Sequence, residues 1–226
     1  MVQSQQNSSA SKIYITTRTI SVSNRKNYIV TKRFIDVMGS LFGIILLSWL
    51  FILIAVAIKI EDPKGPVFFR QKRVGKNGTE FDMYKMRSMV SNAEELLESL
   101  LEQNEVSGAM FKMKNDPRIT KIGRFIRKTS IDELPQLWNV LKGDMSLVGP
   151  RPPLPREVKE YTPYQKQRLL VTPGCTGLWQ VSGRNNIGFE EMVELDLQYI
   201  QKRTFVFDLH IIFKTVKCML FPNSAY

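Results

Sequence analysis

The sequence predicts an α+β protein: a mainly helical, membrane-associated domain with a small antiparallel hairpin, preceded by an N-terminal membrane helix. Three observations support this fold class. Residues 37–58 are 22 consecutive positions without a charge. Two strand-like runs flank an Asn-Gly pair at 77–78, and helical apolar spacing fills much of the remaining chain.

The N-terminal part is polar first and apolar afterwards. Residues 1–28 are rich in Ser, Asn, Gln and Thr, and we interpret them as a mobile basic tail. As a helix, residues 37–58 would extend about 33 Å, which is enough to cross a hydrocarbon layer of roughly 30 Å. The apolar run starts late and no small-residue cleavage site follows it, which disfavours a cleaved signal peptide.

Both flanks of this apolar segment are basic. Residues 1–36 hold six Lys or Arg against one acid, and residues 59–226 hold 26 against 20. Because basic flanks tend to stay in the cytoplasm, neither end is favoured to leave it. A re-entrant helix would keep both ends on one side, with Ser48-Trp49 as the polar interruption near its middle. From these residues alone, an ordinary spanning helix remains the alternative.

A hairpin and several helices are expected after the membrane segment. Residues 66–70 and 80–85 are typical of strands, on either side of Gly75-Lys-Asn-Gly78. Ser91 and Glu94 form a capping box ahead of leucines at helical spacing, which predicts an amphipathic helix up to residue 102. Further helices are expected at residues 121–128, 131–142, 188–202 and 206–221.

The composition excludes several kinds of catalytic and structural site. The chain has 226 residues and a net charge of +11, two cysteines that are 43 positions apart, and one histidine, His210. These counts exclude a disulfide scaffold and a Cys/His zinc site, and they disfavour a Ser-His-Asp triad. The chemistry must therefore depend on carboxylates, basic groups or an added metal.

A basic belt precedes a pair of acids. Seven cations stand against the single acid Asp116: Lys112, Lys114, Arg118, Lys121, Arg124, Arg127 and Lys128. Such a belt would attract anions, although a solvated or lipid-facing surface explains it equally well.

The acids follow in a second capping box, Ser130-Ile-Asp-Glu133, which predicts Ser130 as the N-cap of the next helix. Asp132 and Glu133 would then lie in its first turn, where the helix dipole favours negative charge and a bound phosphate. An ionised carboxylate can attack phosphorus or bind magnesium. In the alternative interpretation, the two acids only complement the dipole and close the cap. Pro135 should interrupt the helix just past them.

Several separated blocks resemble those of one family. The longest is NDPRITKIGRFIRKTSIDELPQLWNVLKGDMSLVGPRP; the others are KRFID, GPVFFRQKRVGKNG, FDMYKMRSM, PGCTGLWQVSGRN and ELDLQYI. Together they resemble the bacterial sugar transferase family, the monotopic polyprenyl-phosphate glycosyl-1-phosphate transferases. The resemblance runs from about Lys32 to the end of the sequence.

The resemblance implies roles for particular residues. Asp132 would be the catalytic nucleophile and Glu133 its catalytic partner, with Mg²⁺ held beside both. Arg127, Arg151 and Arg184 would bind substrate phosphates. Asp208 would support the site by orienting one of these arginines, although it could equally cap a helix.

The resemblance also implies a reaction, an architecture and a location. Asp132 would attack the sugar-bearing phosphorus of a UDP-sugar, UMP would leave, and polyprenyl (undecaprenyl) phosphate would take the sugar phosphate, beginning exopolysaccharide or capsule assembly. The membrane helix over residues 29–60 would be re-entrant, with its break at Ser48-Trp49, where the family has Ser-Pro. Residues 61–226 would form a cytoplasmic catalytic domain with interfacial amphipathic helices, placing the active site on the cytoplasmic face of the bacterial cell membrane.

The resemblance also bears on the sugar and on the partners. The insert over residues 91–113 and the ending NSAY resemble the exopolysaccharide and capsule branch, which favours a hexose such as glucose or galactose over an N-acetylated sugar. Outside the enzyme class, the rival is a non-catalytic basic membrane protein that binds anionic lipid or nucleic acid. We expect membrane lipid and no nucleic acid as partners, and we leave homo-oligomerisation open.

Overall fold

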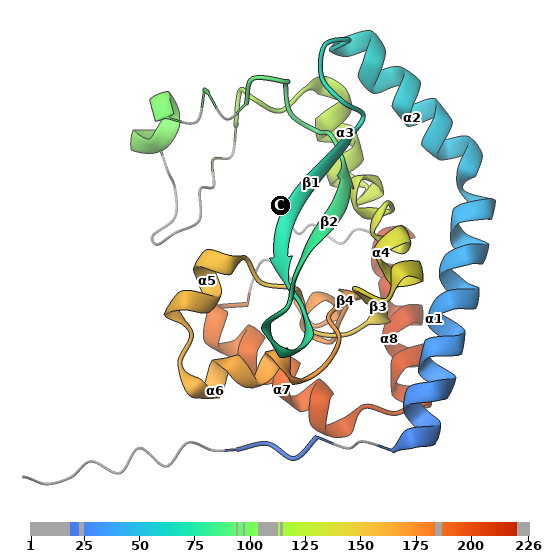
Figure 1. The fold of residues 1–226 in the computed structure, drawn as a ribbon. Helices are drawn as coiled ribbons and strands as arrows, with labels where there is room; N and C mark the ends of the chain where they lie inside the picture. The colour runs from blue at the N-terminus through green and yellow to red at the C-terminus, as the bar shows by residue number, and fades with distance from the viewer. Residues whose placement is uncertain are drawn as a thin grey trace, which may run out of the picture.

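Helices account for most of the residues that the computed structural model describes, which are 19–22, 25–93, 95–96, 98–103, 113, 115–183 and 187–220. The predicted class, a mainly helical α+β protein with a small antiparallel hairpin, is confirmed. A second two-stranded sheet, which is parallel, was not predicted. Figure 1 shows the long helices α1 (Lys26–Leu46) and α2 (Ser48–Glu61) along one side of the molecule and the hairpin nearer its middle.

The apolar segment forms two helices, α1 (Lys26–Leu46) and α2 (Ser48–Glu61), bent by 58°. No single helix in the described part of the chain is long and apolar enough to cross a membrane, although the bent pair meets that test by length and composition. The break falls at Leu47, next to the predicted Ser48-Trp49. There the Ser48 hydroxyl donates to the carbonyl oxygen of Ile45 at 2.8 Å. The first helix starts inside the range that we assigned to the tail, and Ile20, also in that range, is buried.

The predicted hairpin is confirmed. Strands β1 (Phe68–Val74) and β2 (Glu80–Met86) pair antiparallel with Arg70 opposite Tyr84 and Arg73 opposite Phe81. A 3₁₀ turn over Lys76–Gly78 joins them, with φ of 57° at Asn77 and 83° at Gly78. The Asn-Gly pair therefore supplies the left-handed backbone that this turn requires.

The helix predicted up to residue 102 does not form as expected. The described residues there form turns and a 3₁₀ helix over Glu98–Gln103, while Glu94, half of the expected capping box, lies outside them. The backbone N–H of Ser91 donates to Asp62 Oδ2 at 2.8 Å. A tertiary contact with the end of α2 therefore replaces a helix start at this point.

Helix α3 (Lys121–Lys128) is confirmed, but the next helix is divided. A 3₁₀ turn over Ile131–Glu133 precedes α4 (Gln136–Lys142), whose N-cap is Pro135. Ser130 directly precedes this turn, as predicted, and its carbonyl oxygen accepts from the N–H of Glu133 at 3.2 Å, but the predicted capping box was wrong, because its φ is 58° and its side chain makes no cap hydrogen bond. The left-handed Ser130 also follows Thr129, the C-cap of α3, so it links the end of one helix to the start of the next turn.

The C-terminal half combines short elements with two longer helices. Strands β3 (Ser146–Val148) and β4 (Gly174–Thr176) pair in parallel. The chain between them forms α5 (Pro155–Glu160), α6 (Pro163–Lys166) and a 3₁₀ turn over Gln167–Leu170. Another 3₁₀ turn, Trp179–Val181, follows β4. Helices α7 (Phe189–Lys202) and α8 (Phe205–Leu220) match their predicted ranges to within about one residue.

Polar contacts attach both bent helices to the rest of the molecule. From α1, Arg33 donates to the carbonyl oxygens of Val140 and Leu141 at 2.6 and 2.7 Å, capping the end of α4. At the end of α2, the two carboxylate oxygens of Glu61 accept from the backbone N–H groups of Lys121 and Ile122 at 2.7 and 2.9 Å. Both arms of the bent pair are therefore fixed to the same body.

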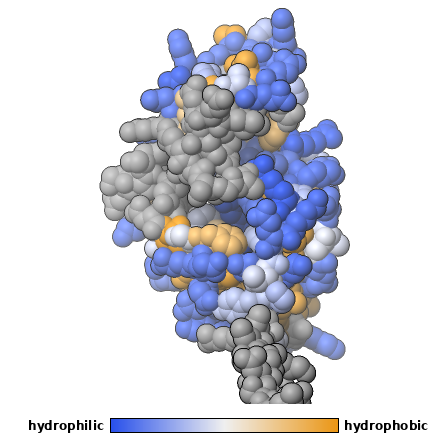
Figure 2. All heavy atoms as spheres, turned by 90° about the vertical axis from the view of Figure 1, so that its left-hand side faces the viewer, coloured by the Kyte–Doolittle hydropathy of each residue, from blue (hydrophilic) through white to orange (hydrophobic). Residues whose placement is uncertain are grey.

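The surface is divided between apolar and polar regions. Large apolar side chains are exposed on α1, α2 and α8, among them Phe42, Ile52 and Phe213 at 65% or more of their full area. Figure 2, which views the molecule from the side away from α1 and α2, shows a mainly hydrophilic face where it is not grey. The described surface is therefore amphipathic as a whole.

Candidate active site

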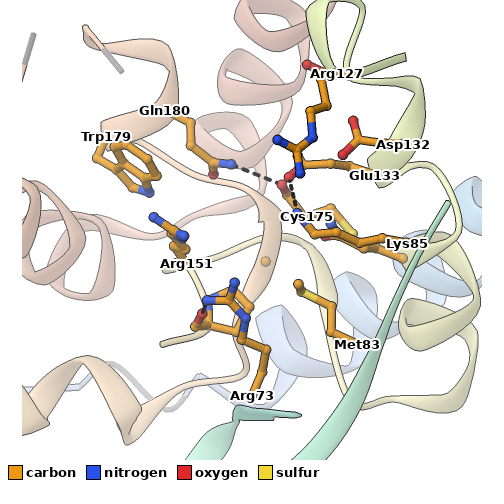
Figure 3. A pocket seen from close by; sticks show the side chains of 14 residues that line it. Arg73, Met83, Lys85, Arg127, Asp132, Glu133, Arg151, Cys175, Trp179 and Gln180 are labelled. Carbon is orange, nitrogen blue, oxygen red and sulfur yellow. Dashed lines mark hydrogen bonds and ion pairs between the residues drawn. The ribbon is translucent and has the colours of Figure 1, made fainter. Parts of the chain in front are cut away.

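A pocket of about 280 Å³ lies where α3, the Ile131–Glu133 turn, the hairpin and the β3–β4 pair meet (Figure 3). Four of its lining side chains are cations and two are carboxylates. Its charged and polar lining comprises Arg73, Lys85, Arg127, Ser130, Asp132, Glu133, Gln136, Arg151, Trp179 and Gln180. The pocket therefore combines an excess of positive charge with a pair of acids.

Asp132 is the buried carboxylate of this pocket, with 8% of its area exposed. It forms no ion pair within the part of the chain that the structure describes. Burial, and then the adjacent charge of Glu133, raise its pKa to about 6, against the opposing attraction of Lys85 and Arg127. The group is therefore mainly ionised at neutral pH but held in surroundings that disfavour its charge.

Glu133 lies at the rim, where its carboxylate forms a 2.8 Å ion pair with Lys85 Nζ from β2. Asn139 fixes this arrangement from α4, because its side chain accepts from the N–H of Tyr84 at 3.0 Å and donates to the carbonyl oxygen of Asp82 at 2.7 Å. A fully buried amide thus joins α4 to the strand that carries Lys85.

Arg127 reaches the pocket from the last turn of α3. Its Nε donates to the hydroxyl of Ser88 at 2.8 Å. Burial lowers the pKa of Arg127 from its ordinary value, and the attraction of Asp132 opposes this shift. The positive charge of Arg127 is therefore attracted to the buried carboxylate of Asp132.

The opposite side of the pocket carries Arg151, Arg73 and Trp179 (Figure 3). Arg151 follows β3, and its guanidinium lies 5.9 Å from the centre of the Trp179 ring. A buried ion pair supports the backbone here: Arg168 binds Asp196 at 2.6 Å and donates to the carbonyl oxygen of Arg151 at 3.4 Å.

The structure brings four of the predicted site residues together. Asp132, Glu133, Arg127 and Arg151 meet in the pocket, whereas Arg184, Lys112 and Lys114 lie outside the described residues. Of the other belt residues, Arg118 forms a 2.7 Å ion pair with Asp116.

Asp208 lies between two helices in the described part of the chain. Its carboxylate binds Lys32 Nζ and the hydroxyls of Tyr28 and Tyr199, each at 2.8 Å. Asp208 therefore joins α8 to α1, and its predicted role in orienting an arginine of the site stays a prediction.

Sequence reasoning missed Lys85, Arg73, Gln136 and Gln180. Met83 and Lys85 both line the pocket, as alternation along β2 would allow, but no local pattern shows which face of a hairpin meets a pocket. Trp179, from the 3₁₀ turn after β4, also lines the pocket.

Two carboxylates are available for a metal. In the described part of the chain, no group of three or more His, Cys, Asp or Glu side chains is placed to hold an ion. Mg²⁺ in phosphate-binding sites commonly uses one or two carboxylates together with substrate oxygens and water. The raised pKa of Asp132, caused partly by its neighbour, fits such a site because a cation would relieve this repulsion. Asp132 and Glu133 therefore suit Mg²⁺ only when a substrate completes the ligand set.

The fold and the pocket together define a class: a protein with an amphipathic surface, an apolar bent helix pair, and a cationic pocket built around a buried carboxylate. Comparison with known proteins gives the family. Residues 27–222 match the bacterial sugar transferase family, and the chain belongs to it.

Curated relatives extend this similarity. The chain is 50% identical to the galactosyl transferase CpsE of Streptococcus agalactiae serotype III (strain NEM316), covering 88% of this chain and 44% of that protein. It is 47% identical to the undecaprenyl-phosphate galactose phosphotransferase of Salmonella typhimurium (strain LT2), covering 86% and 41%. It is 40% identical to the exopolysaccharide production protein ExoY of Rhizobium meliloti (strain 1021), covering 87% and 88%. The chain thus spans less than half of the first two relatives but most of the third.

Proposed function

We propose that the protein transfers a sugar 1-phosphate from a UDP-sugar to polyprenyl (undecaprenyl) phosphate, an early step of exopolysaccharide or capsule assembly. One observation carries this proposal: the buried carboxylate of Asp132 shares a pocket with the guanidinium groups of Arg127 and Arg151. Membership of the sugar transferase family supports it, as does the name of the Salmonella relative, which states the corresponding reaction with galactose.

The reaction would proceed as two displacements at one phosphorus. In the first, a carboxylate oxygen of Asp132 forms a bond to the sugar-bearing phosphorus while the bond to the bridging oxygen breaks, and UMP leaves with the electron pair. In the second, a phosphate oxygen of the lipid attacks the same phosphorus, and the Asp132 carboxylate is released. Because ionised phosphates are weakly basic, neither step requires a histidine as base.

The acids, the metal and the arginines of the pocket would have different roles in this reaction. Glu133, held by Lys85 at 2.8 Å, keeps negative charge beside Asp132. Mg²⁺, which we propose as the cofactor at Asp132 and Glu133, would neutralise phosphate charge when bound. Arg127 and Arg151 would bind phosphate oxygens from two sides of the pocket, and Arg184 remains a proposed third contact.

The bent helices support a membrane location. Exposed apolar side chains on α1, α2 and α8 would contact lipid, which the acceptor's prenyl chain also requires. We propose that α1 and α2 form a re-entrant pair and that the pocket opens on the cytoplasmic face, where UDP-sugars are made.

The sugar is proposed as a hexose, galactose or glucose. The names of the Streptococcus and Salmonella relatives both contain galactose, which supports this choice. An N-acetylated sugar is the alternative within the same reaction.

The deciding experiment measures UMP release by purified protein in nanodiscs with Mg²⁺, undecaprenyl phosphate and a panel of UDP-sugars. We expect one UDP-hexose to react well above the others. The Asp132→Asn variant should lose turnover by roughly 10³-fold or more, because its amide cannot form the covalent intermediate. Mass spectrometry of the wild-type protein with donor alone should find the sugar phosphate on Asp132.

The matched control is Asp82→Asn, which removes a carboxylate from the exposed Lys72–Asp82 pair on the hairpin and should leave turnover unchanged. Normal UMP release by Asp132→Asn would refute the nucleophile assignment. If no sugar nucleotide reacted, the non-catalytic rival would be favoured, and preference for a UDP-N-acetylhexosamine would correct the sugar alone.

A further inference from the structure

Arg73 is a buried guanidinium without a carboxylate partner. Four arginines in the described residues are buried, and three of them pair with an aspartate: Arg87 with Asp62 at 2.9 Å, Arg118 with Asp116 at 2.7 Å, and Arg168 with Asp196 at 2.6 Å. Arg73, with 5% of its area exposed, forms no ion pair in this part of the chain. Burying an uncompensated charge is costly, so an unpaired buried cation in a pocket indicates an anionic ligand.

Neutral acceptors hold the Arg73 side chain in place. Its Nη1 donates to the carbonyl oxygen of Pro152 at 2.9 Å, and its Nε and Nη2 donate to Gln71 Oε1 at 3.2 and 2.6 Å. These bonds use three of the five N–H groups of a guanidinium and leave two for a ligand. The orientation is therefore fixed without neutralising the charge, which is suited to binding a phosphate.

A second cation stands next to it. Arg151 lines the same pocket, follows Pro150 and precedes Pro152, the residue whose carbonyl oxygen holds Arg73. Burial and then the repulsion from Arg151 lower the pKa of Arg73 to about 10, against the weaker attraction of Glu157 and Glu133, neither of which forms an ion pair with it. Two guanidinium groups that repel each other would be stabilised by a shared anion.

The position of this pair fits one part of the reaction. Figure 3 shows Arg73 and Arg151 across the pocket from Asp132 and Arg127. In phosphoryl transfer, the attacking and leaving oxygens lie roughly in line on opposite sides of the phosphorus. A group leaving as Asp132 attacks must therefore lie on the Arg73 side.

We propose that Arg73 and Arg151 form one phosphate site that serves two substrates in turn. In the first displacement it binds the α-phosphate of the leaving UMP. In the second it binds the phosphate of the incoming polyprenyl phosphate, whose oxygen attacks as the Asp132–phosphorus bond breaks. This inference rests on the proposed function and adds Arg73 to the substrate-binding residues.

The test compares Arg73→Gln and Arg73→Lys with Arg70→Gln, which removes an exposed arginine three positions earlier on the same strand. Two constants are measured: the inhibition constant of UMP and the KM of undecaprenyl phosphate. We expect Arg73→Gln to raise both by about tenfold or more, since a charge-assisted hydrogen bond to phosphate is lost. Arg73→Lys should recover part of each loss, and Arg70→Gln should change neither.

Each other outcome overturns the shared site. A rise in the UMP constant alone would restrict Arg73 to the nucleotide, and a rise in the acceptor KM alone would restrict it to the lipid. Unchanged constants in both Arg73 variants would show that the cation binds no substrate.

Two further measurements separate this inference from its premises. Should Arg73→Gln fail to fold, UMP inhibition of the wild-type protein must still be competitive with undecaprenyl phosphate, and non-competitive inhibition would refute the shared site. Absence of a sugar-phosphate adduct on wild-type Asp132 would refute the proposed function instead. Normal adduct formation with unaffected Arg73 variants would refute the inference alone.

Discussion

Asp132 lies where its charged form is disfavoured, because burial and Glu133 both raise its pKa from the ordinary 3.8 to about 6. In a solvated loop the same carboxylate would ionise more readily and would also be more strongly hydrated. A desolvated carboxylate opposite the arginines that we propose bind phosphate suits nucleophilic attack, and holding it there lowers the stability of the fold.

This cost gives a prediction for the substrate-free protein. Below pH 3.8 Asp132 is protonated in the folded and unfolded states, and its pKa contributes nothing. Between pH 3.8 and about 6 the unfolded chain has lost this proton while the folded protein still holds it, so stability falls across that window, by up to about 3 kcal/mol in total once pH exceeds 6. Asp132→Asn should therefore stabilise the protein at pH 8 relative to wild type, and much less at pH 4.

Thermal unfolding in detergent at the two pH values measures this difference. Asp82→Asn serves as the control, because it removes a carboxylate from an exposed pair and should show no comparable gain at pH 8. An Asp132→Asn variant that is no more stable than wild type at pH 8 would contradict the origin given for the raised pKa.

The individual residues of the site were predictable to different degrees. Asp132 and Glu133 are adjacent in a recognisable motif, and Arg127 and Arg151 lie in the same long block of the resemblance. Arg73 and Lys85 are more than 40 positions from Asp132, and their roles depend on how the hairpin packs. Alternation along a strand predicts which residues share a face, but it does not predict what that face will contact.

Among the elements, α3 has a tight contact that positions Arg127. Thr120 caps this helix by accepting from the N–H of Gly123 at 2.9 Å, and Arg127 donates to Ser88 at 2.8 Å. The N–H of Thr120 donates in turn to the Ser88 carbonyl oxygen at 3.2 Å. The helix therefore lies directly against the backbone of Ser88, and the guanidinium of Arg127 depends on that approach.

A methyl group at Gly123 should separate these two segments. Its Cβ would overlap the carbonyl oxygen of Ser88, which is backbone and cannot rotate away. We expect Gly123→Ala to destabilise the protein by roughly 1–3 kcal/mol and to lower turnover, since α3 and Arg127 must shift together.

The control is Gly188→Ala, because nothing lies within 4 Å of a Cβ at Gly188 and its φ is −70°. Melting temperature and UMP release would be measured for both variants. If Gly123→Ala behaved like Gly188→Ala, the close approach of α3 to Ser88 would not be required.

Elements with a strong local signal were predicted well. The Asn-Gly turn fixed the hairpin, and apolar spacing located α7 and α8. The predicted capping box at Ser130 does not form, because this residue joins α3 to the Ile131–Glu133 turn without a linker and adopts a left-handed backbone instead of the extended one of a side-chain N-cap. The parallel β3–β4 pair has only three residues in each strand, too few for a detectable alternation.

At the scale of the whole molecule, the two ends of the bent helix pair are attached to one body. Near the start of α1, Lys32 binds Asp208 of α8 at 2.8 Å, and Asp36 accepts from the N–H of Leu147 at 2.9 Å. At the end of α2, Glu61 binds the first turn of α3. A straight spanning helix would place its two ends on opposite sides of the bilayer, where they could not both make these contacts.

The contacts therefore predict that residues before α1 and after α2 face the same side of the membrane. In a Cys218→Ser background, single cysteines would replace the exposed Lys26 and Lys64, while the native Cys175, a pocket residue whose thiol pKa burial raises, should react slowly. We expect a membrane-impermeant maleimide to label both positions only when the cytoplasmic face of membrane vesicles is exposed. Labelling of Lys26→Cys from the external face, with Lys64→Cys still labelled from the cytoplasm, would establish a spanning helix. That topology is incompatible with the contacts that Lys32 and Asp36 make in this structure.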